Sequence, residues 1–386
     1  MALVTNMVAP YRVSFYNALA ELCDLTVVVD TDSEFNRSWK LDERQFRFTR
    51  LVMNSTSVVV PRKRKDVAYE EQRQVHFSQR LMGVLRAVKP DVVLSNELGL
   101  RSFWSFLYSR LYRCPWLLVS EATEHTEGWV GITKAYFRKF LISQADGFWS
   151  NGIETTRFLI NRGAASIGIT SDMTGIATRE FREEALRAFR DRQGLRKLLG
   201  LDGIVFLFAG RLESGKGIPQ LLQAVMERRV ELAGRCSLLF VGDGTLREEV
   251  ESFGRELRSE IPVYLTGFVQ PEKLPPLFAA SDVFVMPTLD DNWPLVNLEA
   301  LAAGLPQIYS IYNGGAADLN SVAGVGMAID PCTLGELAAK LVECVNVLPS
   351  RVQGAAAIQR LVHYSPEAQA QRALDSISRS LGSHRA

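Results

Sequence analysis

Short apolar runs alternate with longer amphipathic stretches through most of the 386-residue sequence, and this alternation strongly limits the possible folds. The runs have the length of buried strands, and the stretches have the length and periodicity of helices. Strands that alternate with helices build parallel sheets through βαβ units. The sequence therefore predicts an α/β protein with doubly wound parallel sheets. The expected strands are Ala2–Asn6, Leu25–Asp30, Val92–Ser95, Trp116–Ser120, Phe148–Ser150, Val205–Ala209, Ser237–Val241, Val263–Thr266, Val283–Met286 and Gln307–Tyr309.

The alternation lapses between Ile169 and Thr178, where we expect a linker between two domains. The first Rossmann-like domain is then predicted to span 1–175, and the second 176–365. Single long helices are expected at Tyr69–Val88 in the first domain and at Arg179–Leu199 in the second. Ligands of such sheets bind beyond the carboxyl ends of the strands. Two facing domains would therefore bind theirs in a central cleft.

Composition excludes several classes of protein. Apolar residues make up 47% and charged residues 23%, which is ordinary for a globular chain and excludes disordered, collagen-like and disulfide-scaffold proteins. The net charge of +1 argues against a general nucleic-acid binder. The five cysteines are scattered without a CxxC spacing, which favours reduced thiols and argues against a zinc site. We expect no signal peptide and no membrane span.

Two stretches of the first half are rich in basic or aromatic residues. These are Arg62–Lys65, a run of four cations, and Phe103–Arg110, which is rich in aromatic residues. One interpretation is a solvated loop and a core helix. The other is contact between the first domain and an anionic membrane surface.

The first chemical motif is the glycine-rich turn Phe208–Gly217, which follows a predicted strand and precedes a helix. Gly210 would allow a ligand to approach the backbone, and Arg211 and Lys216 would meet its phosphates. The spacing differs from that of a Walker A loop. The alternative is a surface turn with ordinary charges.

The second motif is the turn Val241–Leu246, which contains Gly-Asp-Gly. It resembles half of a dinucleotide fingerprint, but the GxGxxG pattern is incomplete, so NAD binding is not predicted. Thr245 with Glu248 three residues later also fits a plain capping box.

The third motif, Pro287–Pro306, is a polar loop that leads from a strand into a helix. Free amides of Leu295 and Val296 at the start of this helix would bind an anion. Asp291 lies in the loop, and Glu299 lies one turn into the helix. Alternatively, Asp291 caps the helix and Glu299 complements its dipole, although this does not explain the basic turn in the same half.

Together these motifs resemble glycosyltransferase family 4, the retaining group 1 glycosyltransferases of GT-B fold. The family pattern combines a GR-L-x-x-x-KG turn, a GDG turn and an acid seven residues before the Glu of an EA-x-A-x-GLP helix. Asn313–Asp318 resembles the family's next glycine-rich turn, and Pro10–Leu19 resembles the opening helix of bacterial members that build surface polysaccharide. The resemblance implies a GT-B protein whose final helix, 366–386, packs back on the first domain.

The resemblance implies a role for each motif residue. Arg211 and Lys216 would hold the donor diphosphate, the amides of Leu295 and Val296 would complete the phosphate site, and Gly210 would line it.

Further along the same motifs, Glu299 would accept hydrogen bonds from the two ribose hydroxyls, and Asp291 would contact the donor sugar. The turn that ends at Val269 would lie against the base. Family members usually have Glu at position 291 and Gly at 294, where this chain has Asp291 and Pro294.

The acceptor side falls in the first domain. Many family members carry a His near the reaction centre in the loop that corresponds to 121–128, so His125 and Glu121 are candidates. Arg12 and Asn6 lie near the end of the first strand and are further candidates. A surface-loop histidine is the alternative for His125.

The function implied is retaining transfer of a sugar from a UDP- or GDP-linked donor to an acceptor hydroxyl, with Arg211, Lys216, Asp291 and His125 as candidate catalytic residues. No cofactor and no metal are expected. A lipid-linked saccharide in bacterial surface polysaccharide synthesis is the expected acceptor, and the cytoplasm, including the inner face of the membrane, the expected location. A sugar-nucleotide epimerase of the same fold and a non-catalytic nucleotide-sugar-binding homologue are the alternatives.

Overall fold

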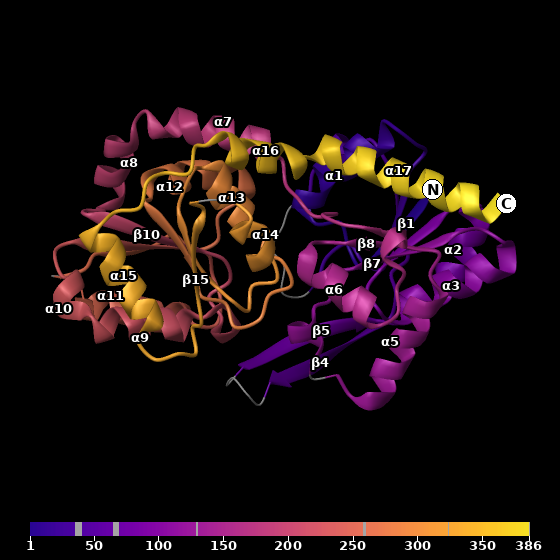
Figure 1. The fold of residues 1–386 in the computed structure, drawn as a ribbon, viewed down its shortest axis with the longest axis horizontal. Coiled ribbons are helices and arrows are strands. Elements are labelled where there is room, and N and C mark those ends of the chain that lie inside the picture. Colours follow the sequence, from indigo (N-terminus) through magenta and orange to yellow (C-terminus); the bar gives the residue numbers. More distant parts are fainter. Residues whose placement is uncertain (35–40, 65–68, 129, 258–259, 323, 386) are drawn as a thin grey trace. The chain divides into compact units, whose positions relative to one another are not determined.

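The computed structural model describes residues 1–34, 41–64, 69–128, 130–257, 260–322 and 324–385, which form two compact units (Figure 1). The first consists of Met1–Arg62, Glu71–Ala177 and His363–Ala386, and the second is built on Thr178–Val362. Each unit has its own parallel sheet and its own hydrophobic core.

Seven parallel strands form the sheet of the first unit, in the order β3-β2-β1-β6-β7-β8-β9. The strands are β1 (Ala2–Thr5), β2 (Thr26–Val29), β3 (Thr49–Val52), β6 (Val93–Asn96), β7 (Trp116–Ser120), β8 (Gly147–Ser150) and β9 (Ile169–Thr170). The strand order reverses between β1 and β6, and this is where a doubly wound sheet opens a ligand crevice at its carboxyl edge.

Helices cover both faces of this sheet. They are α1 (Pro10–Ala20), α2 (Leu81–Val88), α3 (Leu100–Tyr112), α4 (Glu124–Glu127), α5 (Ile132–Gln144), α6 (Ile153–Asn161) and α17 (Pro366–Arg385), with short 3₁₀ turns at Glu43–Gln45 and Ser166–Gly168. The final helix, α17, packs beside α1 (Figure 1). Trp149 Nε1 of β8 donates a hydrogen bond of 3.1 Å to Ser376 Oγ of α17. The last segment of the chain therefore completes the core of the first unit.

The long helix expected at Tyr69–Val88 is wrong. The chain instead forms two strands that pair with each other, β4 (Ser57–Arg64) and β5 (Tyr69–His76), and only Leu81–Val88 is helical. The polar residues of β5 have no strong period of their own, so pairing with β4 overrides their helical propensity. In the basic run 62–65, Lys65 lies outside the described residues, and the side chains of the other three are not described.

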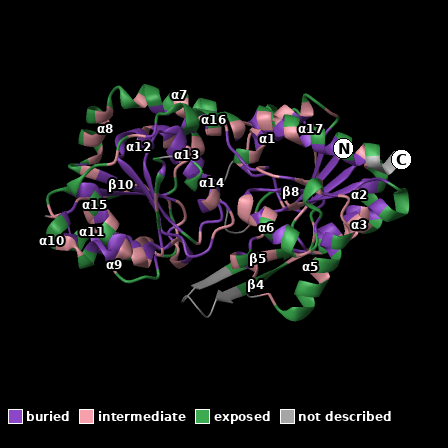
Figure 2. Ribbon diagram, viewed as in Figure 1, coloured by how far each residue is buried: buried purple, intermediate pink, exposed green. Residues whose placement is uncertain are grey.

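Six parallel strands form the sheet of the second unit, in the order β12-β11-β10-β13-β14-β15. The strands are β10 (Ile204–Ala209), β11 (Cys236–Val241), β12 (Val263–Leu265), β13 (Val283–Met286), β14 (Gln307–Ser310) and β15 (Gly326–Ile329). Here the order reverses between β10 and β13. The strands of the sheet's centre are continuous apolar runs because helices cover both faces, as the buried strands in Figure 2 show.

Helices of the second unit surround this sheet. They are α7 (Thr178–Phe189), α8 (Arg192–Leu199), α9 (Ile218–Glu227), α10 (Arg229–Leu232), α11 (Arg247–Leu257), α12 (Leu274–Ala280), α13 (Val296–Ala302), α14 (Ala316–Asn320), α15 (Glu336–Asn346) and α16 (Ala355–His363), with 3₁₀ turns at Ser214–Lys216 and Pro271–Lys273. The single helix expected at Arg179–Leu199 is broken into α7 and α8. Arg192 and Arg196 of α8 both pair with Asp282, which precedes β13. These two ion pairs fix α8 against the sheet, so that it does not continue α7.

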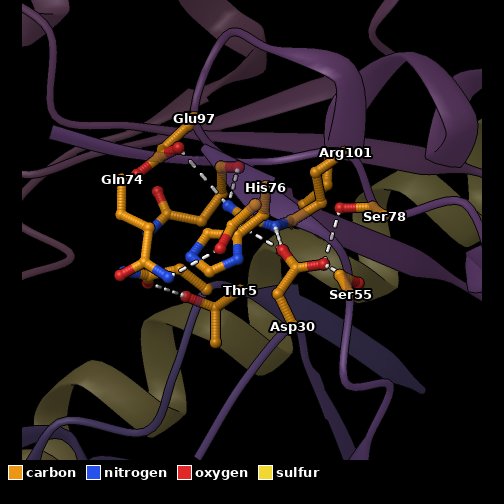
Figure 3. A network of polar contacts seen from close by, with 12 residues as sticks. Thr5, Asp30, Ser55, Gln74, His76, Ser78, Glu97 and Arg101 are labelled. Carbon is orange, nitrogen blue, oxygen red and sulfur yellow. Dashed lines mark hydrogen bonds and ion pairs between the residues drawn. The ribbon is translucent and has the colours of Figure 1, made fainter. Parts of the chain in front are cut away.

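A buried ion pair holds the carboxyl edge of the first sheet together (Figure 3). Asp30, directly after β2, is fully buried and accepts hydrogen bonds from Arg101 of α3 at 2.7 and 2.9 Å. The hydroxyls of Ser55 and Ser78 donate to its other oxygen at 2.6 and 2.7 Å. Arg101 Nη1 also donates to the Asn96 carbonyl at the end of β6, at 3.1 Å. One carboxylate thus connects segments that follow β2, β3 and β6.

We predict that Arg101→Leu lowers the free energy of unfolding of the first unit by about 3–5 kcal/mol, because it leaves the Asp30 carboxylate buried without its charged partner. Urea unfolding followed by the fluorescence of buried Trp116 and Trp149 measures the change. The matched control is Arg157→Ala, which removes an exposed pair with Glu154 and should cost at most about 1 kcal/mol. Equal midpoints for the two variants would contradict the prediction.

Candidate active site

The candidate site lies at the carboxyl edge of the second sheet, at the point where the strand order reverses. Arg211 and Lys216 follow β10, and Asp291 follows β13, the strand beside it. The first and third sequence motifs therefore meet at the position where doubly wound sheets bind their ligands.

A close approach of two backbone segments places Lys216. The 3₁₀ turn Ser214–Lys216 packs on the loop after β13, where the carbonyl of Gly215 accepts hydrogen bonds from Thr288 Oγ1 at 3.0 Å and from the Leu289 amide at 2.9 Å. Gly217 follows with a φ of +75°, and a Cβ there would lie 1.9 Å from the Pro287 carbonyl oxygen. Only glycine fits, and as a result the Lys216 ammonium forms an ion pair with the Asp291 carboxylate.

The Gly-Asp-Gly motif packs against the same turn. A Cβ at Gly242 would lie 1.9 Å from the Gly210 carbonyl oxygen, and the Gly242 amide donates to Gly267 at 3.0 Å. The Leu212 amide donates to the Asp243 carbonyl at 2.9 Å. These contacts explain the glycines by packing.

The capping box proposed for the second motif is wrong. Helix α11 begins at Arg247, two residues after Thr245, and the Leu246 amide donates instead to the Leu212 carbonyl at 2.9 Å. The turn is therefore held by the neighbouring motif and not by its own helix.

Arg211 lies in the same turn as a half-buried cation. Its Nη1 donates to the Glu213 carboxylate at 2.7 Å, and both side chains are partly exposed. Glu213 was not singled out from the sequence, although it stands inside the GR-L-x-x-x-KG pattern. The ion pair with Glu213 fixes the position of the Arg211 guanidinium at the partly exposed surface of the turn.

Asp291 does not cap helix α13, so that interpretation is wrong. The helix starts at Val296 with Leu295 as its cap residue and has no side-chain cap. Asp291 Oδ1 instead accepts from the Trp293 amide at 3.2 Å, and its backbone carbonyl accepts from Gly314 at 2.9 Å. These bonds hold the loop in the shape that presents the start of α13.

Three hydrogen-bonding groups at the start of α13 remain open. Among the described residues, none accepts a hydrogen bond from the amides of Leu295 or Val296, and none donates to the Glu299 carboxylate. Glu299 is partly buried, and burial raises its pKa to about 7. A carboxylate without a protein partner, one turn from two open amides, is suited to a ligand that has both an anionic group and hydroxyls.

Buried residues of the turn after β14 pack against the loop that precedes α13. Asp318, which is buried, accepts from Trp293 Nε1 at 3.2 Å and pairs with Arg360 at 3.4 Å. A Cβ at Gly315 would lie 2.8 Å from the Trp293 ring, which explains the glycine of the Asn313–Asp318 turn. This acid therefore positions the loop rather than facing a ligand.

Val269, the candidate for contact with the nucleotide base of the donor, lies in the turn after β12. Gly267 has a φ of +71° and accepts the hydrogen bond from Gly242, so it belongs to the packed turns. Val269 packs partly buried against the core of the second unit, and Phe268 between them is exposed.

Three of the acceptor-side candidates lie at the carboxyl edge of the first sheet. Arg12 of α1 pairs with Glu121 after β7 at 3.0 Å and donates to the Met173 carbonyl at 3.0 Å. Asn6, after β1, donates to Glu34 Oε1 at 2.7 Å.

His125 lies farther along, on α4, and is partly buried. Two polar residues of this edge were not singled out from the sequence: Glu34, and the buried His76 of β5 (Figure 3). His76 Nε2 lies 3.5 Å from Glu34 Oε1. Glu34 could have been noticed from its place soon after the second expected strand. His76 could not, because β5 was expected to be helical.

No three His, Cys, Asp or Glu side chains gather as metal ligands in the part of the chain that the structure describes. The same residues contain no helix long and apolar enough to cross a membrane.

Comparison with known proteins adds to this geometry. Residues 191–351 match the family model described as glycosyl transferases group 1. The sulfoquinovosyl transferase of Arabidopsis thaliana is 25% identical over 258 residues, which cover 63% of this chain and 47% of that protein. The chain spans 47%, 33% and 29% of the first three curated relatives that it matches.

Solved structures resemble the whole chain. A glycosyltransferase from Rickettsia africae has a TM-score of 0.74 at 13% identity, and Anabaena Alr3699/HepE in complex with UDP-glucose has 0.71 at 15%, each with 98% of both chains covered. At such identities the likeness shows the fold. The chain is thus related to the group 1 glycosyltransferases through residues 191–351, and its fold is GT-B, with two Rossmann-like domains.

Proposed function

We propose that the chain is a retaining glycosyltransferase of family 4, which moves a sugar from a nucleoside diphosphate donor to an acceptor hydroxyl. The start of α13 carries the proposal: Glu299 and the amides of Leu295 and Val296 have no protein partner among the described residues. A ribose diphosphate offers both hydroxyls for the carboxylate and an anion for the amides. The match to the group 1 family supports the same assignment.

The cations of the β10 turn would bind the donor diphosphate. Lys216 and Arg211 are already held by Asp291 and Glu213, so they need little reorganisation when the donor binds. Negative charge grows on the leaving phosphate as the C1–O bond breaks. Groups aimed at that charge lower the barrier, which is the largest catalytic effect expected here.

Asp291 would contact the donor sugar. Its Oδ1 receives the Trp293 amide and its Oδ2 pairs with Lys216, so the carboxylate lies between the loop and the phosphate-binding cation. Hydroxyls of the sugar could share these oxygens with Lys216, whose ammonium has further N–H groups to donate to phosphate. The aspartate side chain is one methylene shorter than the glutamate usual in the family. Its carboxylate therefore lies closer to the backbone of the loop, where it contacts Lys216 directly.

The proposed reaction needs no metal. The departing phosphate oxygen takes the proton of the acceptor hydroxyl on the same face of the sugar, which gives retention. Arg211, Lys216 and two amides would supply the positive charge that a divalent ion supplies elsewhere. UDP or GDP is the proposed leaving group, and UDP has the support of the Anabaena complex.

The acceptor would bind the first unit near Arg12, Glu121, Asn6 and His125. We propose a lipid-linked saccharide of bacterial surface polysaccharide synthesis as its class. The chain would then act in the cytoplasm, in peripheral contact with the inner face of the membrane.

We predict that Arg211→Ala and Lys216→Ala each lower turnover by about 10²-fold or more, because each removes a preorganised group that stabilises the leaving phosphate. UDP or GDP in EDTA should raise the melting temperature of the wild-type chain by several degrees at about 100 times its dissociation constant, and raise it less in both variants. Lys340→Ala, which removes an exposed pair with Glu343, is the control. Unchanged turnover in both variants would contradict the phosphate assignment.

The melting assay, together with analysis of the reaction products, separates the alternatives. Nucleotide binding with a changed donor sugar and no acceptor product would indicate an epimerase. Nucleotide binding without any turnover would indicate a binding protein.

We predict that nucleotide affinity rises as pH increases from about 5.5 to about 7 and then levels off, and that binding below about pH 7 releases a proton. Ribose hydroxyls bond best to ionised Glu299, and its pKa without ligand is about 7. Calorimetric titration with UDP in two buffers of different ionisation enthalpy measures the proton count. Glu299→Gln should abolish the proton release and weaken binding. A proton count that is unchanged in this variant would contradict the assignment.

Without ligand, the same pKa predicts the opposite trend for stability. The unfolded chain loses the Glu299 proton near its ordinary value of 4.5, whereas the folded chain keeps it to about 7. The folded state therefore binds more protons in this window, and this group's contribution to the free energy of unfolding falls as pH rises through it. Glu299→Gln should remove that component.

A further inference from the structure

An exposed apolar stripe runs along α5 in the first unit. Ile132, Tyr136 and Phe140 stand four residues apart, so they share one side of the helix, and they are 74%, 70% and 42% exposed. Figure 2 shows exposed residues along this helix. Large apolar side chains in a contiguous exposed row mark an interaction surface more often than isolated ones do.

The stripe continues onto α3. The ring of Phe140 contacts that of Phe106 on α3, with centroids 5.5 Å apart, so the two helices share a surface. Leu107 and Leu111 lie on the exposed side of α3, and Leu111 is 63% exposed. We name Leu107, Leu111, Ile132, Tyr136 and Phe140 the α3–α5 face.

The aromatic residues noted in the sequence form the base of this face and not its outer layer. Phe103, Trp104 and Phe106 of α3 are only partly exposed and pack against the core of the first unit. Phe103 also contacts Phe137 of α5, with centroids 6.0 Å apart. The core-helix interpretation therefore describes these three residues, and the exposed apolar residues come mainly from α5.

The charged residues on the helices of the face are all cations. Helices α2, α3 and α5 contain no Asp or Glu. Arg110, Lys134 and Lys139 are exposed on α3 and α5. Asp146 lies 3.5 Å from Arg110, which also lies over the Phe106 ring at 5.5 Å. Cations beside exposed aromatic and aliphatic groups match a surface that is anionic outside and apolar beneath.

A basic hollow adjoins the face at the end of α3. Its volume is about 440 Å³, and its lining is Arg86, Lys89, Pro90, Tyr108 and Tyr112. Arg86 Nε donates to the Tyr112 hydroxyl at 2.6 Å, and the two tyrosine rings stack at 4.5 Å. Two cations beside a stacked tyrosine pair suit the phosphate of a lipid headgroup.

We propose that the α3–α5 face docks the chain on an anionic lipid bilayer. Its apolar side chains would enter the boundary between headgroups and acyl chains, while Arg110, Lys134 and Lys139 meet lipid phosphates. A second copy fits less well, because a self-complementary contact would bring cations of the same sign together. This proposal rests on the peripheral membrane contact proposed above and names the residues that would make it. Its test does not depend on sugar transfer.

The test is co-sedimentation of the full chain with vesicles of phosphatidylcholine, with and without phosphatidylglycerol. Wild-type protein should partition onto the anionic vesicles only, and less so as salt rises. The double variant Ile132→Ser/Tyr136→Ser should reduce partitioning at least tenfold. Lys139→Gln should reduce it about fivefold, which corresponds to about 1 kcal/mol for one cation near such a surface.

The matched control is Ile167→Ser, because Ile167 is 88% exposed in the first unit but outside the face. It should bind vesicles like the wild type. All of the substituted side chains are on the surface, so melting temperatures and nucleotide-induced shifts should be unchanged.

Three results would overturn the proposal: no wild-type binding to anionic vesicles at low salt, equal binding to neutral vesicles, or wild-type binding by the double variant and Lys139→Gln. A concentration-dependent dimer that only the double variant abolishes would assign the face to a second copy instead. Vesicle binding without any nucleotide shift would support docking and count against the proposed transferase. The reverse result would reject docking and leave the transferase assignment standing.

Discussion

The candidate site depends on how closely backbone turns pack at the carboxyl edge of the second sheet. At Gly217, Gly242 and Gly314, an added Cβ would lie 1.9 Å from a carbonyl oxygen of a neighbouring turn. Side chains at these positions would push apart the segments that carry Lys216 and Asp291. Lys216 and Asp291 can therefore form their ion pair because these three turns carry glycines, which have no side chain to separate the backbone segments. The chemistry follows from a packing constraint on backbone atoms.

The parallel sheets could be predicted because their central strands are buried on both faces and read as continuous apolar runs. The paired strands β4 and β5 could not, because β5 is mostly polar and its pairing with β4, not its sequence period, makes it a strand. Likewise, the break between α7 and α8 depends on Asp282, which lies about 90 residues away from the arginines it binds. Local periodicity carries no information about such distant partners.

The same distinction applies to the site. Lys216, Asp291 and Glu299 could be singled out because each lies in a short motif at the end of a strand. Their environment could not be derived in advance: the contact between Lys216 and Asp291 joins residues 75 apart. The raised pKa of Glu299 comes from burial, which only the folded chain creates. Spacing identified the groups, and folding determined their charges and partners.

Helix α17 shows that the first unit is discontinuous in sequence. Its last element is made after the whole of Thr178–Val362, although Trp149 of β8 needs that helix as a hydrogen-bond partner and as cover. On the ribosome, the second unit can therefore finish folding while the first still exposes the apolar residues of α1 that α17 covers. The two units can therefore finish folding in the opposite order to that of their synthesis, because the first unit is complete only once α17 has been made.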